Sequence, residues 1–99
     1  MMPEELSTKQ RKHLKMLGHG LNPIVQVGLK GLTENVIQQM DKDLSFHELV
    51  KVRFACDDRE ERKRLVSQLA QATGSLRVHS IGRNALLYRQ SPEHKIKIP

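Results

Sequence analysis

Apolar residues recur along the chain with two alternating periods. Spacings of three and four residues indicate helices with one buried face, and strict alternation of apolar and polar residues indicates half-buried strands. The pattern predicts helices from Ser7 to about Leu17, from Thr33 past Leu44, and from Asp57-Asp58 to Gly74. It predicts strands over 24–27, 48–54, 76–80 and 85–89. The predicted order is therefore α-β-α-β-α-β-β.

Capping and turn residues support these boundaries. Ser7 and Gln10 have the spacing of a capping box, Thr33 suits an N-cap, and Gly18 and Gly74 follow the first and third helices as C-terminal glycines do. In the first helix we expect Gln10, Leu14 and Leu17 to share the inner face.

The order of elements predicts an α/β fold. Strand–helix–strand units favour right-handed crossovers with parallel neighbours, and Gly82-Arg83-Asn84 favours a final antiparallel hairpin. We therefore expect a two-layer sandwich with a mixed four-stranded sheet and helices on one face. The other face would present Lys51, Arg53 and Arg77, with His79 beside them.

The 99 residues suffice for one domain, with a core over about 6–90 and a tail over 91–99. The tail has no strong pattern, which predicts mobility. The first ten residues lack the apolar region of a secretory signal, and no apolar run approaches the ~20 residues of a membrane span. With a single cysteine, Cys56, these features predict a soluble cytoplasmic protein.

The net charge of +6 is concentrated in two blocks. Residues 6–33 contain no acid, and residues 75–99 contain one, Glu93. The bases of the two blocks are Lys9, Arg11, Lys12, Lys15 and Lys30, and then Arg77, Arg83, Arg89, Lys95 and Lys97. Such clustering favours a polyanion partner, although many stable small proteins are also basic. The run DDREERKR is balanced, which favours a solvated helix face.

The first helix carries bases without acidic partners. Lys9, Arg11, Lys12 and Lys15 spread over the side opposite Leu14, and an ordinary solvated face would alternate in sign. We interpret this side as a functional basic face. Aromatic residues are limited to Phe46, Phe54 and Tyr88, so a platform of stacked aromatics is not expected. Binding would then depend on phosphates and shape.

The segment NPIVQVGLKGLTEN places a glycine-bracketed turn between a strand and a helix. Glycines allow unusual backbone angles and close approach of another chain. Lys30 adds a cation at the tip, and the helix that begins near Thr33 adds partial positive charge. The turn Gly28–Gly31 is therefore a candidate contact for an anion or a nucleic acid.

With these motifs, the chain resembles the CRM family, the chloroplast RNA splicing and ribosome maturation domain. The resemblance rests on LSTKQRKHLKMLGHGLNPIVQVG, GLKGLTENVI and IGRNALLYR, and covers roughly residues 6–90. It is greatest to the stand-alone bacterial members of the YhbY type. It implies a sheet and helices like those of the C-terminal domain of bacterial initiation factor three, with an additional N-terminal helix.

The resemblance also implies RNA binding without catalysis. Bacterial members are associated with precursors of the large ribosomal subunit, so it implies a role in ribosome assembly on pre-50S ribosomal RNA. The RNA-binding residues carried over are Gly28, Leu29, Lys30 and Gly31, with Arg83 of the last hairpin. Thr33 and the bases of the first helix complete the candidate site, and Lys51, Arg53 and Arg77 are weaker candidates. Leu29 could contact a base or a protein.

Two other classes of function stay open. A protein-interaction module that docks on ribosomal proteins is compatible with Leu29 and the basic sheet face. A nucleotide-binding enzyme is disfavoured, because GLKG lacks the Walker spacing and its Lys-Ser/Thr ending. The histidines at 13, 19, 47, 79 and 94 match no zinc spacing, so we expect no metal, cofactor or catalytic residue. Cys56 is interpreted as a small buried hydrophobe.

Overall fold

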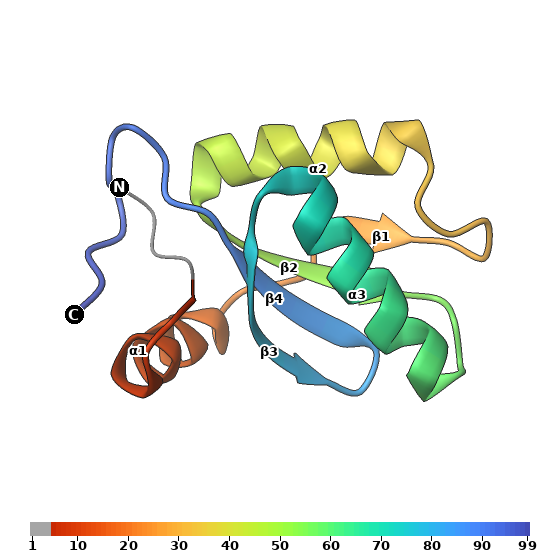
Figure 1. The fold of residues 1–99 in the computed structure, drawn as a ribbon, viewed down its shortest axis with the longest axis horizontal. Helices are drawn as coiled ribbons and strands as arrows, with labels where there is room; N and C mark the ends of the chain where they lie inside the picture. Colours follow the sequence, from red (N-terminus) through yellow and green to blue (C-terminus); the bar gives the residue numbers. More distant parts are fainter. Residues whose placement is uncertain (1–4) are drawn as a thin grey trace.

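The computed structural model describes residues 5–99, which form three helices and four strands in the predicted order (Figure 1). The elements are α1 (Thr8–Gly18), β1 (Val25–Val27), α2 (Glu34–His47), β2 (Leu49–Phe54), α3 (Arg59–Thr73), β3 (Leu76–Ile81) and β4 (Asn84–Tyr88). No helix in residues 5–99 has the length and apolar character needed to cross a membrane.

The strands form one mixed sheet in the order β1-β2-β4-β3. β1 is parallel to β2, while β4 is antiparallel to both β2 and β3. The predicted α/β fold with a four-stranded mixed sheet is confirmed. The expectation of parallel neighbours holds for β1 and β2 only, because β4 lies between β2 and β3. The reason is burial: Ala85 to Tyr88 are all buried, and a strand that is apolar on both faces belongs in the middle of a sheet.

The main core lies between one face of the sheet and the pair of helices α2 and α3. Val50, Val52 and Phe54 of β2 face this core, as the alternation of β2 predicts. Met40 and Leu44 of α2 are fully buried against them. The other buried members are Val25, Val27, Leu65, Val66, Leu69, Ala85 and Leu87.

A second core lies on the opposite face of the sheet, under α1. Leu14 of α1 packs there with Leu86 and Tyr88 of β4 and Val78 of β3. The expectation that all helices cover one face is therefore wrong, because α1 covers the opposite face. The apolar residues that β2 and β4 present on that face also need to be shielded from water. Leu17 is 41% exposed, and Gly18 takes the inner position in its place.

The helix boundaries follow the predicted caps with one exception. The capping box of Ser7 and Gln10 is present, Thr33 caps α2, and Gly74 ends α3 with φ of +65°. Gly18, however, is the last residue of α1 and has no positive φ. A β-carbon at Gly18 would lie 2.3 Å from Cδ1 of Leu86, so this glycine is required for close packing of α1 on the sheet.

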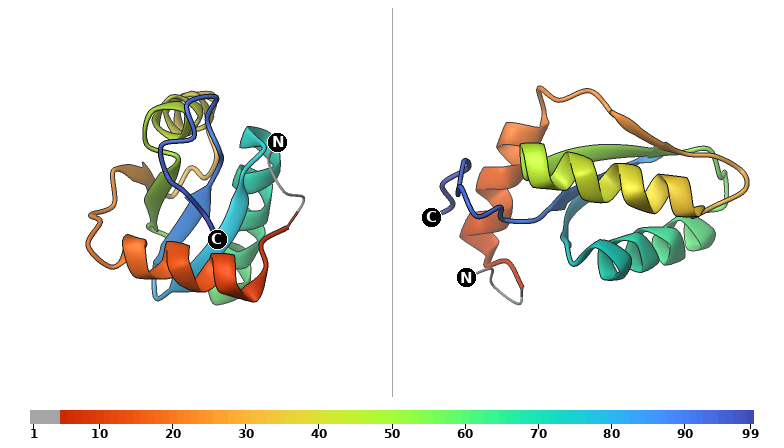
Figure 2. Two further views of the ribbon diagram at one scale, coloured as in Figure 1. Left: turned by 90° about the vertical axis from the view of Figure 1, so that its left-hand side faces the viewer. Right: turned by 90° about the horizontal axis from the view of Figure 1, so that it is seen from above.

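The C-terminal segment packs on the domain, contrary to the predicted mobility of 91–99. Ile96 and Ile98 contact the second core, and the side-chain amide of Gln10 donates to the carbonyl of Pro99 at 2.9 Å. Figure 2 shows this segment running beside α1. This packing could not be predicted because the segment is short, contains Pro92 and Pro99, and is anchored mainly through its backbone N–H groups.

Candidate nucleic-acid interface

The turn Gly28–Gly31 lies between β1 and α2 at one end of the long axis of the molecule (Figure 1). The N–H of Gly31 donates to the carbonyl of Gly28 at 3.0 Å, which closes the turn. Leu29 at the tip is 87% exposed. Lys30 is also exposed, and within residues 5–99 its ammonium group has no hydrogen-bond or ion-pair partner. The turn presents one apolar and one cationic side chain to solvent.

The two glycines of the turn have different structural roles. Gly31 has φ of +77°, a conformation that side chains disfavour. Gly28 has no positive φ, and a β-carbon built on it would meet nothing within 4 Å. The expected need for glycine geometry therefore holds for Gly31. At Gly28 the missing side chain leaves open space beside the turn.

Thr33 has a capping role in the site. Its hydroxyl accepts a hydrogen bond from the N–H of Val36 at 3.2 Å, which fixes the start of α2 directly after the turn. The N–H groups of the first helical turn point toward this end and carry partial positive charge. The carboxylate of Glu34 lies in the same helical turn and partly neutralises this positive charge.

Arg83 lies at the same end of the molecule as the Gly28–Gly31 turn. The N–H of Phe54 donates to the carbonyl of Arg83 at 2.8 Å, and the N–H of Ala55 donates to the carbonyl of Val27 at 2.9 Å. The ends of β1, β2 and the β3–β4 hairpin therefore meet. The guanidinium of Arg83 forms an ion pair with Asp57, so its charge is partly neutralised.

The bases of α1 lie away from the turn. Figures 1 and 2 place α1 toward one end of the long axis and the Gly28–Gly31 turn at the other. Lys9, Lys12 and Lys15 are exposed there. The structure does not bring the two predicted halves of the site side by side.

Arg11 differs from the other bases of α1 because its guanidinium is engaged within the protein. Nη1 of Arg11 donates to the carbonyl of Arg77 at 2.5 Å and to the carbonyl of Val78 at 2.8 Å. This contact joins α1 to β3 at the position where the pairing of β3 with β4 shifts its register. Arg11 is thus a structural contact of the strand.

That register shift is a β-bulge, and it corrects the predicted placement of Arg77. Alternation would place Arg77 and His79 on the same face as Lys51 and Arg53. In the structure His79 pairs with Leu86 of the second core, whereas Arg77 pairs with Leu87 of the main core. The extra residue of a bulge turns the flanking side chains to opposite faces. Arg77 therefore lies on the side of α3, away from Lys51 and Arg53.

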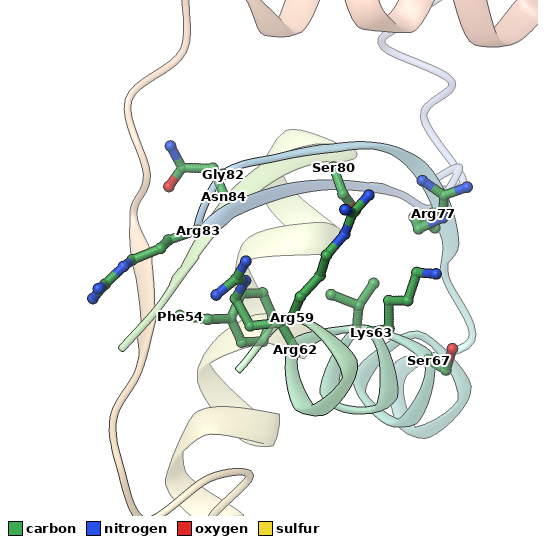
Figure 3. Close-up of a pocket in the computed structure, with 11 residues that line it drawn as sticks. Phe54, Arg59, Arg62, Lys63, Ser67, Arg77, Ser80, Gly82, Arg83 and Asn84 are labelled. Atoms are coloured by element: carbon green, nitrogen blue, oxygen red, sulfur yellow. The ribbon is translucent and has the colours of Figure 1, made fainter. Parts of the chain in front are cut away.

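A groove between α3 and the β3–β4 hairpin is lined by bases of the run DDREERKR, which was expected to be a solvated helix face (Figure 3). Its volume is about 630 Å³. Arg59, Arg62 and Lys63 line it from α3, and Arg77 and Arg83 belong to the hairpin side. Among residues 5–99, no acidic side chain lines it. We refer to it as the α3 groove.

The balanced net charge of the run DDREERKR does not predict the α3 groove, because the bases of this run gather on one face of α3. Arg59, Arg62 and Lys63 are three and four residues apart, so they share one face of α3. Glu61 instead pairs with Arg64 outside the groove. The spacing of these bases predicts that they share a face of α3. The orientation of Arg77 toward that face, however, depends on the bulge in β3.

His79 lies on the second face of the sheet, with positive charges near it. Burial, and then the charges of Lys15, Arg77 and His19, lower the pKa of His79 below its usual value. The neutral form of His79 is therefore favoured at pH 7, because its ordinary pKa already lies below that pH. Within residues 5–99, no three histidine, cysteine or acidic side chains are grouped so that they could hold a metal ion.

The family of the chain follows from comparison with known proteins. Residues 6–89 match the model of the CRS1 / YhbY (CRM) domain, which is nearly the whole chain. The chain belongs to the CRM family. In this CRM protein the matched region includes the Gly28–Gly31 turn, α3 and the final hairpin.

Relatives of this CRM protein share most of its length. An RNA-binding protein of Haemophilus influenzae is 44% identical over 94 residues, which is 95% of each chain. A candidate RNA-binding protein of Pseudomonas aeruginosa is 40% identical and covers 89% of this chain and 85% of its own. The solution structure of a candidate RNA-binding protein of Staphylococcus aureus superposes with a TM-score of 0.85 at 39% identity, covering 95% of this chain and 99% of its own.

Proposed function

We propose that the protein is a non-catalytic RNA-binding factor of the cytoplasm that acts in assembly of the large ribosomal subunit. The observation that carries the proposal is the exposure of two side chains, Leu29 and Lys30, at the tip of the Gly28–Gly31 turn. The names of the Haemophilus and Pseudomonas relatives support RNA as the partner. The resemblance to YhbY-type proteins supports precursor 50S ribosomal RNA as the particular RNA.

The contact would be made by the turn and the cations around it. Lys30 would pair with a phosphate, and the open space at Gly28 would let the RNA backbone approach the turn. Leu29 would contact a base. Arg83 lies at the same end but is paired with Asp57, so a phosphate would have to displace that carboxylate for Arg83 to contribute. Lys9, Lys12 and Lys15 would form a separate basic surface on α1. Lys51 and Arg53 would be further contacts on the second face of the sheet.

Lys30→Glu tests this proposal. The variant should weaken binding to large-subunit ribosomal RNA and precursor particles, because it replaces a phosphate partner by a repelling charge. Loss of one phosphate contact should lower the log–log salt slope of binding by about one. Lys42→Glu is the matched control, since Lys42 is an exposed lysine of α2 with the same charge change. Equal affinity of the two variants in a salt-controlled assay would refute the role of the turn.

The assembly role needs its own experiment. Cells lacking the protein should accumulate large-subunit precursors in sedimentation profiles, and wild-type protein should restore the normal profile. The Lys30→Glu variant should restore it poorly and the Lys42→Glu variant fully. A normal profile in cells lacking the protein would contradict the assembly role while leaving RNA binding intact.

Docking on a ribosomal protein is the alternative that one observation favours, namely the 87% exposure of Leu29. An apolar tip side chain is suited to a protein pocket as well as to a base. Crosslinking to intact and nuclease-treated particles separates the two. Contact that survives nuclease and depends on Leu29 would favour the protein partner.

A further inference from the structure

The α3 groove has cations on both of its walls. Arg59, Arg62 and Lys63 come from α3, and Arg77 comes from β3 across the groove. Figure 3 shows Lys63 rising from the helix toward the strand that carries Arg77, and Arg83 pointing away from the groove. A chain lying in the groove would therefore meet positive charge on two sides.

Three of these cations are available for an external partner. Arg62 is not among them, because its Nη1 donates to the carbonyls of Cys56 at 3.1 Å and Asp57 at 2.7 Å. Arg83 is not among them either, because it pairs with Asp57. Arg59, Lys63 and Arg77 are exposed and have no hydrogen-bond or ion-pair partner in the part of the chain that the structure describes.

Three unpaired cations around one acid-free groove repel one another. None of the three side chains is stabilised by the other two, and each raises the local positive potential. An anion between them would remove this repulsion. The arrangement thus favours a polyanion that can contact several cations at once over a single small anion.

We propose that the α3 groove binds the sugar–phosphate backbone of a single RNA strand that continues from the Gly28–Gly31 turn. The inference rests on the proposed function and extends it to a second contact site. The turn lies near the groove, since the N–H of Ala55 donates to the carbonyl of Val27, directly before the turn, and the N–H of Phe54 donates to the carbonyl of Arg83, which lines the groove. A groove that is basic on both walls fits one backbone between them, whereas a duplex carries its two backbones on its outside.

Recognition in the groove is by charge and not by base identity. Phe54 at its floor is 1% exposed, so no aromatic ring is available for stacking. Ser67 and Ser80 line the groove and add hydroxyl groups, which donate well to phosphate oxygens. Binding there should be insensitive to sequence and strongly dependent on salt.

The test compares full-length variants that each lose two positive charges. Lys63→Gln with Arg77→Gln removes the facing cations of the groove, and Lys42→Gln with Lys97→Gln removes two exposed lysines elsewhere. The probe is a fluorescent single-stranded RNA of about twelve nucleotides, within the range that single-strand sites span. The groove variant should bind roughly tenfold more weakly, and its log–log salt slope should fall by about 1.4, or 0.7 per phosphate contact. Thermal midpoints confirm that both variants are folded.

The outcomes separate the groove from the turn. If the groove variant binds like its control while Lys30→Glu is weakened, the groove proposal is overturned and the proposed function stands. If wild-type protein binds no RNA, both are overturned. The groove proposal is also overturned if the groove substitutions weaken binding of duplex RNA more than binding of single-stranded RNA. It is likewise overturned if they weaken only the binding to nuclease-treated particles.

Chemical footprinting gives a readout without any substitution. Acetylation of Lys63 in the wild-type protein, measured by mass spectrometry, should slow when single-stranded RNA is added, and acetylation of Lys42 should not. Equal protection of the two lysines would contradict the proposal.

Discussion

The carboxylate of Glu48, at the end of α2, accepts hydrogen bonds from both the backbone N–H and the hydroxyl of Ser91, 43 residues later. The N–H groups of Lys95 and Ile96 donate to the same carboxylate at 3.0 and 2.7 Å. Glu48 is fully buried and has φ of +67°. One acidic side chain therefore ties the C-terminal segment to the domain.

Glu48→Gln should destabilise the protein by roughly 3 kcal/mol, because hydrogen bonds to a charged group are strong and the amide NH₂ would oppose buried donors. The measurement is the free energy of unfolding in urea. Glu93→Gln is the control, since Glu93 lies on the same segment with its side chain exposed. Equal stability of the two variants would show that the carboxylate does not hold the segment.

The same carboxylate should make stability depend on pH. Burial by itself raises the pKa of Glu48, but the hydroxyl of Ser91 and the N–H groups of Ile96, Ser91 and Lys95 lower it, and the net pKa lies below the ordinary 4.5. A carboxyl with a depressed pKa stabilises the fold above its unfolded pKa and loses that contribution as pH falls through the folded value. Wild-type stability should therefore decline below about pH 4.5, and the curve of Glu48→Gln should decline less. Parallel curves down to low pH would contradict this origin.

Gly18→Ala should loosen α1 from the sheet. The added β-carbon would lie 2.3 and 2.8 Å from the two δ-carbons of Leu86, which is buried in the second core. Overpacking of this kind costs about 1–3 kcal/mol, against a gain of up to about 1 kcal/mol in helix propensity. Gly20→Ala is the matched control, because a β-carbon there meets nothing within 4 Å.

A double-mutant cycle with Leu86→Ala identifies the cause. Truncating Leu86 makes room for the new methyl group, so the two substitutions together should cost less than the sum of their separate effects. Strict additivity would mean that Gly18 acts through something other than contact with Leu86.

The elements of the fold could be predicted from the sequence because local patterns determine them. Caps at Ser7 and Thr33 and the alternation of Val50, Val52 and Phe54 involve residues that are close in sequence. The strand order could not be predicted from adjacency alone, since it depends on which strand is buried on both faces. The run Ala85–Tyr88 carried that signal.

The exposure of the turn could be predicted from the sequence, whereas the placement of several other bases could not. Leu29 and Lys30 are exposed at the tip of the Gly28–Gly31 turn, in agreement with the motif. The positions of two bases were predicted wrongly. The bulge in β3 turns Arg77 to the other face of the sheet, and the guanidinium of Arg11 donates to a backbone carbonyl at this bulge. The contact of Arg11 at this bulge joins residues that are 66 positions apart in sequence, so local patterns do not reveal it.

The two glycines of the turn allow folding and binding to be separated. Gly31→Ala places a side chain at φ of +77°, so it should cost about 1 kcal/mol or more of stability. Gly28→Ala meets no neighbouring atom and has no positive φ, so it should be neutral or stabilising by about 0.4–1 kcal/mol. If RNA approaches the turn at Gly28, this well-folded variant should nevertheless bind single-stranded RNA more weakly than wild-type protein. Urea unfolding and fluorescence anisotropy on the same samples check the two halves, and unchanged RNA affinity of Gly28→Ala would mean that the open space at Gly28 is not a contact.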